Sequence, residues 1–338
     1  MKINLTQNKN FKLFKIISKV AQENNQTVYI VGGYVRDLLM QRKAPTDIDF
    51  VTEQSGIELA KAVGKELGDL KVSVFKTYGT AMIKYKDLDL EFVGARKESY
   101  SEDSRKPAVE TGTLEDDQKR RDFTVNALAI SLNAENFGEL IDPFNGREDM
   151  QNKILRTPLE PAQTYSDDPL RMMRAIRFAS VLHFNIEENS LEAIKQEAER
   201  IKIVSMERIM VEFNKIMLSE KPSVGLKLME ETTLLEKIIP ELTALRGIEE
   251  VEGQTHKDNF WHTLEVVDNI SKNTDNLWLR WAALLHDIGK APTKKFVEKI
   301  GWTFHGHEFL GSKMVKNLFT RLKLPLGPDM KYVQKMVK

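Results

Sequence analysis

The sequence has no cysteine and no hydrophobic run that approaches the length of a membrane span. Without cysteine, disulfides, thiolate metal ligands and a cysteine nucleophile are excluded, and a reducing cytoplasm fits this composition. No apolar signal segment follows Met1, so we expect neither export nor membrane attachment and predict a cytoplasmic protein. Net charge is also lacking, because 50 Lys and Arg residues balance 50 Asp and Glu residues. Overall charge therefore gives no indication of a nucleic-acid partner.

A chain of 338 residues is too long for one compact core, so at least two domains are expected. Mixed strand and helix patterns continue to about Ile141 and predict an α+β domain over residues 1–150. From Asp149 onward the hydrophobic spacing is helical almost throughout. We divide this helical part into residues 151–250 and residues 251–338.

The first domain is predicted to alternate between helices and strands. Helices are expected over residues 11–24, 34–41 and 57–67, and strands over residues 27–31, 72–75, 80–85 and 87–93. Residues 99–118 are polar and contain Pro107 and Gly112, so we predict a mobile loop there. The helices expected later in the chain cover residues 169–181, 190–201, 206–217, 223–231, 259–271, 277–285 and 330–337.

The most informative segment is Gly32-Gly33-Tyr34-Val35-Arg36-Asp37, followed ten residues later by Asp47-Ile48-Asp49. Alternate residues of a strand face one side, so Asp47 and Asp49 present two carboxylates to one point. Paired hard oxygen ligands favour Mg²⁺, which takes further ligands from water and substrate phosphates. The glycine pair lets backbone N–H groups approach a triphosphate closely. Each feature is common alone, but together they predict phosphoryl or nucleotidyl transfer.

A third carboxylate is expected from the alternating strand Asp87-Leu88-Asp89-Leu90-Glu91. Such a strand can bring Asp89 and Glu91 beside the first pair, where one of them would complete a metal shell and help deprotonate an attacking hydroxyl. We favour Glu91 because it lies deeper in the apolar part of the strand. The alternative is a solvated edge face, for which alternation is equally typical.

Two later segments carry arginines next to acidic residues. In Arg121-Asp122-Phe123-Thr124-Val125-Asn126 a helix would place Asp122 and Asn126 on one face, able to hold a ribose while Arg121 reaches a phosphate. An N-capped helix with a basic flank is the alternative.

The second of these segments is Asp167-Asp168-Pro169-Leu170-Arg171-Met172-Met173-Arg174-Ala175-Ile176-Arg177. Here Asp168 and Arg171 can offer a nucleobase an edge of donors and acceptors, and Arg174 is better placed for phosphates. Ion pairs between helices are the alternative.

These motifs resemble, in order, those of the tRNA nucleotidyltransferase/poly(A) polymerase family in its class II bacterial branch. Besides the segments above, the resemblance includes Asp142-Pro143-Phe144-Asn145-Gly146-Arg147-Glu148-Asp149 and Ser205-Met206-Glu207-Arg208-Ile209 with Glu212. It extends from about Val28 to Lys215. The resemblance implies a polymerase-β-like head, a helical neck and body, and Mg²⁺-dependent addition of CMP and AMP from CTP and ATP to the 3′ end of tRNA.

The resemblance also implies roles for individual residues. Asp47 and Asp49 would bind Mg²⁺, and Gly32, Gly33 and Arg36 would hold the triphosphate. Sugar and phosphate contacts would come from Arg121, Asp122 and Asn126, and base selection from Asp168 and Arg171. One departure is Asp167, which stands where the family usually has glutamate and which bears on how Arg171 is oriented.

A second site is expected in the last quarter of the chain, where five of the six histidines lie. The segment Leu285-His286-Asp287-Ile288-Gly289, with His262 one helix earlier and His307 one loop later, resembles the HD-domain metal phosphohydrolases. Imidazole and carboxylate ligands suit Mn²⁺, Fe, Ni²⁺ or Zn²⁺. We expect structural roles for His256 and His305. Family HD sites use a further ligand beyond this region, so the site is expected to be incomplete within the 338 residues.

The sequence therefore predicts a CCA-adding nucleotidyltransferase with an HD domain that has phosphohydrolase activity. A poly(A) polymerase of the same family, a specialist that adds only CC or only A, and an HD phosphohydrolase that uses the head for recruitment remain alternatives. A regulatory module with a degenerate head is a further alternative, but the intact Asp47, Asp49 and Arg36 oppose it. Mg²⁺, a second divalent transition metal, tRNA, CTP and ATP are the expected cofactors and partners.

Overall fold

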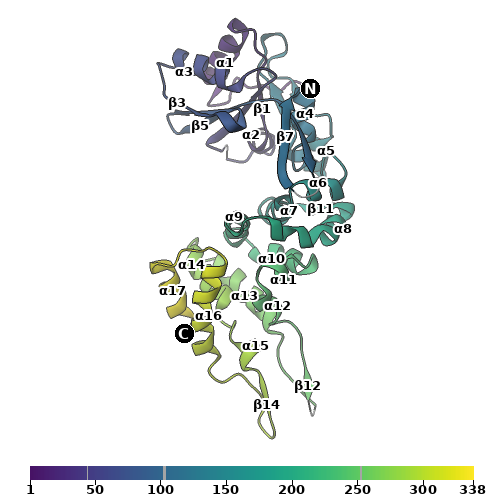
Figure 1. Cartoon of the computed structure of the whole chain (residues 1–338), viewed down its shortest axis with the longest axis vertical. Coiled ribbons are helices and arrows are strands. Elements are labelled where there is room, and N and C mark those ends of the chain that lie inside the picture. The colour runs from purple at the N-terminus through teal and green to yellow at the C-terminus, as the bar shows by residue number, and fades with distance from the viewer. Residues whose placement is uncertain (44, 102–103, 252) are drawn as a thin grey trace. The chain divides into compact units, whose positions relative to one another are not determined.

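The computed structural model describes residues 1–43, 45–101, 104–251 and 253–338. The chain divides into two compact units, Met1–Asp167 and Asp168–Lys338, each of which is described by itself (Figure 1). The first contains a sheet with helices and the second is mainly helical, so the predicted fold class is confirmed. No helix within the described ranges is both long and apolar enough to cross a bilayer.

A seven-stranded sheet forms the centre of the first unit. Its strand order is β3 (Val72–Phe75), β4 (Thr80–Tyr85), β5 (Leu88–Gly94), β2 (Asp47–Thr52), β1 (Tyr29–Val31), β8 (Ala129–Ser131) and β9 (Leu140–Ile141). Strands β2 and β5 run parallel, whereas the other neighbouring pairs in this order are antiparallel. This single parallel pair brings the equivalent ends of two strands together.

Three helices complete the sheet domain: α1 (Phe11–Glu23), α2 (Gly33–Leu39) and α3 (Gly56–Glu66). Helix α1 packs against α3, and α3 packs on β4 and β5. The core between α1 and the sheet contains Phe14, Phe50 and Phe92, all fully buried, and the rings of Phe50 and Phe92 stack with centroids 4.9 Å apart. Burying each such side chain contributes about 2–3 kcal/mol, which holds β2 and β5 in register.

The loop predicted over residues 99–118 is wrong for the part of this segment that the structure describes, and residues 102–103 lie outside the described ranges. The chain instead forms a two-stranded ribbon, β6 (Arg96–Ser101) with β7 (Ser104–Thr111), followed by helix α4 (Leu114–Lys119). Each strand of the ribbon pairs its backbone with the other strand, and this pairing does not need an apolar sequence pattern. Helix α4 begins with a capping box, in which the Thr113 hydroxyl accepts from the Asp116 N–H and the Asp116 carboxylate accepts from the Thr113 N–H. This local signal was overlooked in the sequence.

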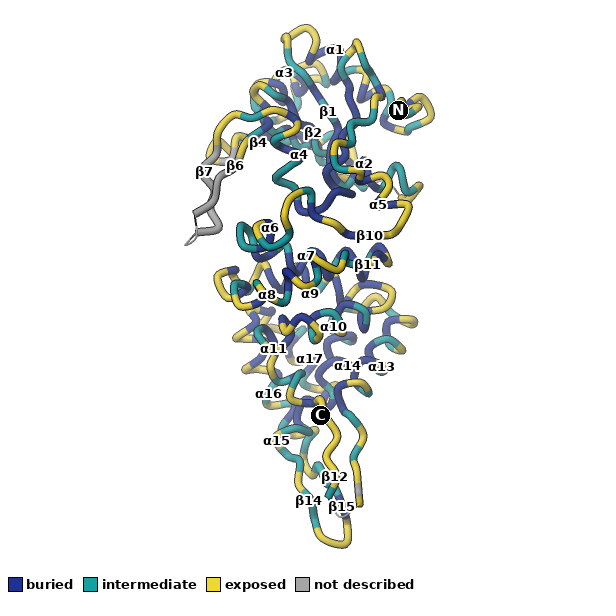
Figure 2. The backbone as a smooth tube through the Cα atoms, turned by 90° about the vertical axis from the view of Figure 1, so that its right-hand side faces the viewer, coloured by how far each residue is buried: buried dark blue, intermediate teal, exposed yellow. Residues whose placement is uncertain are grey.

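The first unit continues through α5 (Gly146–Asn152), β10 (Ile154–Leu155) and α6 (Pro161–Asp167). The second unit contains helices whose buried residues recur on one side (Figure 2). Its longer elements are α7 (Leu170–Leu182), α8 (Glu188–Glu197), α9 (Met206–Met217), α10 (Pro222–Glu231), α13 (Asn259–Ser271), α14 (Leu277–Leu285), α16 (His307–Arg321) and α17 (Pro328–Val337).

Shorter elements in the second unit are β11 (Asn185–Ile186), α11 (Leu234–Ile238), α12 (Pro240–Thr243) and α15 (Lys290–Thr293). Two small hairpins also occur, β12 (Glu250–Val251) with β13 (Gln254–Thr255) and β14 (Lys295–Val297) with β15 (Gly301–Thr303). The prediction that the chain is helical almost throughout from Asp149 onward is therefore corrected at these hairpins.

Arg280 ties three helices of the second unit together. Its side chain is 2% exposed and donates hydrogen bonds to carbonyls at the C-terminal ends of two helices, those of Met217 and Ser219 at α9 and those of Ser271 and Thr274 at α13. The carbonyls at a helix C-terminus have no partner within the helix, so one guanidinium on α14 satisfies the ends of two neighbouring helices.

Replacing Arg280 with Met should lower the free energy of unfolding of the second unit by about 3 kcal/mol or more, because several buried carbonyls lose their donor. Urea unfolding followed by tryptophan fluorescence measures this unit specifically, since all four Trp residues lie between Trp261 and Trp302. Arg246→Met is the matched control: that side chain is 55% exposed and pairs with Glu230, and its loss should cost less than about 1 kcal/mol. Equal midpoints for the two variants would contradict the assigned role of Arg280.

Candidate catalytic and metal-binding sites

The parallel pairing of β2 and β5 places four carboxylates in two adjacent rows. In the register Asp47 lies opposite Asp89, and Asp49 lies opposite Glu91. The expected proximity of the β5 carboxylates to the first pair is therefore confirmed. Asp49 and Glu91 are partly buried, whereas Asp47 is exposed.

The electrostatics of this cluster favour a bound cation. Burial raises the pKa of Asp49, and Asp47 and Asp117 raise it further, while Arg121 acts in the opposite direction. Burial also raises the pKa of Glu91, with Asp49 adding to the effect and Arg96 opposing it. Carboxylates with raised pKa values carry negative charge that the protein compensates incompletely, and oxygen donors of this kind are the ligands that Mg²⁺ prefers. The residues therefore fit a divalent cation.

The glycine turn lies directly beside Asp49. Gly32 adopts a positive φ of 74°, and a Cβ atom at this position would stand 3.0 Å from Arg121 Nη1 and 3.4 Å from Asp49 Oδ2. Any other residue would therefore be strained in its backbone and would crowd both side chains. The turn, the carboxylate and the guanidinium together form one site.

Arg36 and Asn126 are also brought together. Arg36 Nη1 donates to Asn126 Oδ1 at 2.7 Å, and Asn126 Nδ2 donates to Asp122 Oδ1 at 2.9 Å. The helix predicted for Asp122 to Asn126 is wrong: Phe123 is extended and residues Thr124–Asn126 form a short 3₁₀ turn. Asp122 and Asn126 nevertheless contact each other, because the turn brings Asn126 back beside Asp122.

Asp117 was missed by the sequence reasoning. Its side chain is fully buried on α4, where its carboxylate pairs with the guanidiniums of Arg120 and Arg121. Burial alone would raise the pKa of Asp117, but the two arginines outweigh it and the pKa lies below its ordinary value. The signal was present as arginines three and four residues after the aspartate, but it was hidden because this segment was predicted to be a loop.

The residues expected to select the base lie in the second unit. Asp168 lies just before α7, and its Oδ1 accepts a hydrogen bond from the Leu170 N–H at 3.3 Å. Arg171 lies in the first turn of α7. Farther along α7, Arg177 Nε lies 2.6 Å from Glu212 Oε2, and Arg174 Nη1 lies 4.0 Å from Glu212 Oε1. Ion pairing between helices was the alternative raised for these arginines. Arg177 forms such a pair between α7 and α9.

The HD residues converge around Asp287 at the end of α14. Ligand atoms of His262, His286 and Asp287 lie within 4.8 Å of one another. His307 Nε2 is 3.6 Å from Asp287 Oδ1. Three of the four HD residues selected from the sequence thus form one cluster, and His307 lies beside the other oxygen of the same carboxylate. Imidazoles with a carboxylate fit a transition metal better than Ca²⁺.

Backbone carbonyls orient two of these imidazoles. His286 Nδ1 lies 2.8 Å from the Ala283 carbonyl, and His307 Nδ1 lies 2.9 Å from the Phe304 carbonyl. Each contact holds the Nδ1–H and leaves the Nε2 lone pair directed at the site, the arrangement typical of metal-ligating histidine. Burial favours the neutral acid, but the His286 contact and Lys290 lower the pKa of Asp287 to about 2. The carboxylate is therefore ionised and able to bind a metal.

The remaining histidines of this region do not join the cluster. His256 packs edge-on against Trp302 and Phe304 next to the hairpins, and His305 is exposed.

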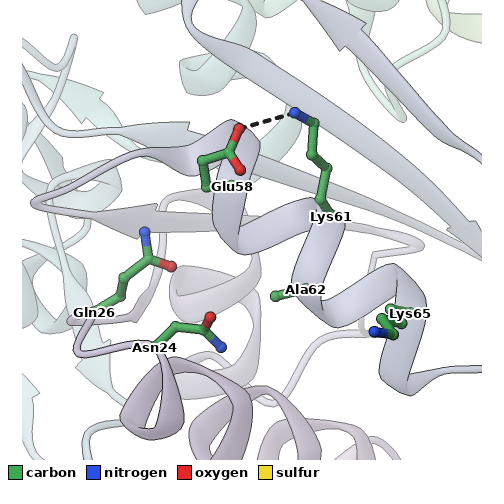
Figure 3. Close-up of a pocket in the computed structure, with 6 residues that line it drawn as sticks. All are labelled: Asn24, Gln26, Glu58, Lys61, Ala62 and Lys65. Atoms are coloured by element: carbon green, nitrogen blue, oxygen red, sulfur yellow. Dashed lines mark hydrogen bonds and ion pairs between the residues drawn. The ribbon is translucent and has the colours of Figure 1, made fainter.

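An open cavity in the first unit lies away from the carboxylates. It has a volume of about 320 Å³ and is lined by Asn24, Gln26, Glu58, Lys61, Ala62 and Lys65 (Figure 3). Gln26 Nε2 donates a hydrogen bond to the carbonyl of Ser55. Ser55 lies just after the C-terminal end of β2, whereas Asp47 lies at the N-terminal end of that strand. Glu58 and Lys61 pair with each other within it. This cavity is therefore separate from the candidate catalytic site.

Comparison with known families gives three matches along the chain. Residues 28–156 match the Poly A polymerase head domain, residues 183–245 match a probable RNA and SrmB-binding site of polymerase A, and residues 259–338 match the HD domain. Families of the first and third kinds generally use divalent metals.

Several characterised proteins are similar over most of the chain. The A-adding tRNA nucleotidyltransferase of Aquifex aeolicus is 34% identical over 85% of this chain, and the chain spans 34% of that protein's length. The multifunctional CCA protein of Shewanella frigidimarina is 32% identical over 88% of this chain and 70% of its own. A tRNA nucleotidyltransferase crystallised with a primer tRNA and an incoming ATP analog superimposes with a TM-score of 0.65 and 28% identity, covering 94% of this chain and 83% of that one.

Asp49→Asn should stabilise the ligand-free protein at neutral pH by about 1 kcal/mol. A carboxyl whose pKa is raised on folding opposes the folded state when it is ionised. This cost is fully present above the folded pKa and disappears as the pH falls below the unfolded pKa. The gain should therefore shrink between about pH 7 and about pH 4, as measured by thermal unfolding in EDTA.

Asp89→Asn is the control, because Asp89 pairs with Lys84 at 3.3 Å and its removal should give no gain. Added Mg²⁺ should raise the melting temperature of the unsubstituted protein more than that of Asp49→Asn. A less stable Asp49→Asn protein at neutral pH in EDTA would rule out the uncompensated charge.

Proposed function

Because the chain belongs to the tRNA nucleotidyltransferase/poly(A) polymerase family, we propose that it adds CMP and AMP to the 3′ end of tRNA. CTP and ATP would be the substrates and no template would be used. The observation that carries the proposal is the β2–β5 register, which brings Asp47, Asp49 and Glu91 to one face of two adjacent strands, with Asp49 beside the glycine turn.

In this proposal Asp47 and Asp49 hold Mg²⁺, and Glu91 completes the carboxylate cluster next to them. The metal would neutralise phosphate charge and lower the pKa of the attacking 3′ hydroxyl. The partly buried Glu91, whose pKa is raised by burial and by Asp49, would accept a proton from that hydroxyl.

The remaining head residues would hold the nucleotide. Gly32 and Gly33 leave room for the triphosphate, and Arg121 directs positive charge towards the same place. Asp122 and Asn126, linked to each other by a hydrogen bond, would contact the ribose. Arg36 already donates to Asn126 and to Asp37, so part of its contribution would be to hold this group in place.

Base selection is assigned to Asp168 and Arg171, with Arg174 directed to phosphate. Asp167, in place of the family's glutamate, accepts a hydrogen bond from Gln163. We assign residues 1–150 to nucleotide transfer and residues 151–250 to nucleotide selection and RNA binding. Residues 251–338 are assigned to the HD domain, and a cytoplasmic location is part of the proposal.

A second activity is favoured by the His262, His286, Asp287 and His307 cluster. We assign these residues to Mn²⁺, Fe, Ni²⁺ or Zn²⁺ and to phosphohydrolysis. Lys290, whose Nζ lies 2.7 Å from Asp287 Oδ2, supplies a positive charge beside the ligands that suits a phosphate.

Two variants of nucleotide addition compete with the main proposal. The Aquifex aeolicus relative is named for A addition alone, and a poly(A) polymerase would use the same head residues. Both would incorporate AMP without needing CTP. The number and identity of nucleotides added to a defined tRNA end separate the three.

Replacing Asp47 and Asp49 together with Ala should reduce nucleotide addition to below about one thousandth of the unsubstituted rate, because the metal ligands are lost. Hydrolysis of bis(p-nitrophenyl) phosphate should survive in that protein. His286→Ala should show the reverse pattern and should lose bound transition metal by elemental analysis.

His305→Ala is the matched control, since His305 is an exposed histidine of the same region, and it should retain both activities. Nucleotide addition that persists without Asp47 and Asp49 would make the proposed mechanism wrong.

A further inference from the structure

We propose that Asp117 is a positioning residue for nucleotide transfer, whose buried carboxylate fixes the Arg121 guanidinium over the glycine turn and beside Asp49. The inference rests on the proposed function, which assigns Arg121 to the nucleotide. Asp117 itself is enclosed by the protein and is not placed to touch substrate.

Helix α4 provides a fixed platform for Asp117. The capping box starts the helix, and Leu114 is buried with Val31, Val51, Ala95 and Ala129. At the other end Gln118 Nε2 donates to the carbonyls of Ala127 at 2.6 Å and Ile141 at 3.2 Å. The backbone that carries Asp117 is therefore anchored to β1, β2, β8 and β9 on both sides.

The two oxygens of Asp117 are divided between two arginines. Arg120 donates to Oδ1 through Nε and Nη2. Arg121 donates to Oδ2 through Nε at 3.0 Å and pairs with it through Nη2 at 2.9 Å. Two contacts from one edge of a planar guanidinium fix both its position and its rotation.

This two-contact pairing of Nε and Nη2 with Asp117, here called the fork, leaves Nη1 of Arg121 facing the glycine turn. Nη1 lies 3.4 Å from the Asn126 carbonyl and 3.0 Å from the place where a Cβ of Gly32 would be. The same point is 3.4 Å from Asp49 Oδ2. A phosphate group that enters over Gly32 would meet Nη1 without any rearrangement of Arg121.

Charge explains why a carboxylate is needed here. Two guanidiniums and one carboxylate leave one net positive charge next to Asp49, and both arginines keep the pKa of Asp117 below its ordinary value. An amide of the same shape would direct N–H donors at one of the guanidiniums, which has only donors to offer. Arg121 would then lose its fork and its defined orientation.

The experiment compares Asp117→Asn, Arg121→Gln and the double variant in the 338-residue chain. We expect Asp117→Asn to lower kcat/KM about 10- to 100-fold, equally for CTP and ATP, because the contact is to phosphate and not to the base. In the Arg121→Gln background the same change should cost less than about 2-fold. Losses that multiply in the double variant would overturn the inference, since Asp117 would then act independently of Arg121.

Glu115→Gln is the matched control: it makes the same change in charge two residues away, on an exposed side chain that pairs with Lys119, and should leave kcat/KM within about 2-fold of the unsubstituted value. If Asp117→Asn does not fold, Asp117→Glu takes its place. That variant keeps the charge but moves the fork by one methylene, and any loss should again disappear in the Arg121→Gln background.

A second readout does not depend on catalysis. In protein labelled with ¹⁵N-arginine, the Arg121 Nε–H should exchange slowly with solvent, and Asp117→Asn but not Glu115→Gln should abolish this protection. Unchanged protection in Asp117→Asn would overturn the inference. If the unsubstituted protein added no nucleotide to tRNA, the proposed function would fail, and this measurement would still decide whether Asp117 holds Arg121.

Discussion

Negative charge concentrated on two parallel strands is the constraint around which the first unit is arranged. The β2–β5 register sets Asp47 and Asp49 beside Asp89 and Glu91, and burial raises the pKa values of Asp49 and Glu91. The aromatic stack of Phe50 and Phe92 holds this register from the opposite face of the strands. Oxygen donors of this kind suit a divalent cation, and in the proposed function the glycine turn would leave room for the triphosphate beside it.

The protein's own positive charge at this cluster is supplied indirectly. Arg121 lies beside Asp49, but its orientation comes from Asp117 on a different element. The HD cluster of the second unit uses the same principle with other donors: carbonyls of Ala283 and Phe304 set the imidazoles of His286 and His307. At both clusters, the side chains that point towards the candidate ligand site are oriented by neighbouring groups that do not point towards it.

Much of the fold could be predicted because hydrophobic periodicity dictates it. Strands β3 and β4 and helices α9, α13 and α14 were predicted with the bounds that the structure has, since each buries one regular face. The family was also recognisable, because Asp47, Asp49 and the segment around Asp122 follow one another at characteristic spacings. The proximity of Glu91 to Asp49 followed from strand alternation and is confirmed by the register.

The missed features depend on contacts between residues that periodicity does not link. The β6–β7 ribbon pairs only with itself, so its polar sequence resembled a loop, and the helix that carries Asp117 was lost with it. The turn at Thr124 to Asn126 is held by hydrogen bonds of Asn126 with Asp122 and Arg36. No local sequence pattern predicts these hydrogen bonds. Ion pairs between helices were raised as an alternative for the arginines of α7, but spacing along one helix could not identify Glu212 as the partner of Arg177.

The most direct test of the account uses tRNA transcripts that end before CCA, after CC or after the complete CCA, each incubated with CTP alone, ATP alone or both in the presence of Mg²⁺. The account predicts two C additions from CTP, then a single A addition that requires ATP, and no extension of the complete end. Repeated A addition to every RNA would identify a poly(A) polymerase, and A addition confined to the CC end without any use of CTP would identify an A-adding specialist. Either result would contradict the central claim.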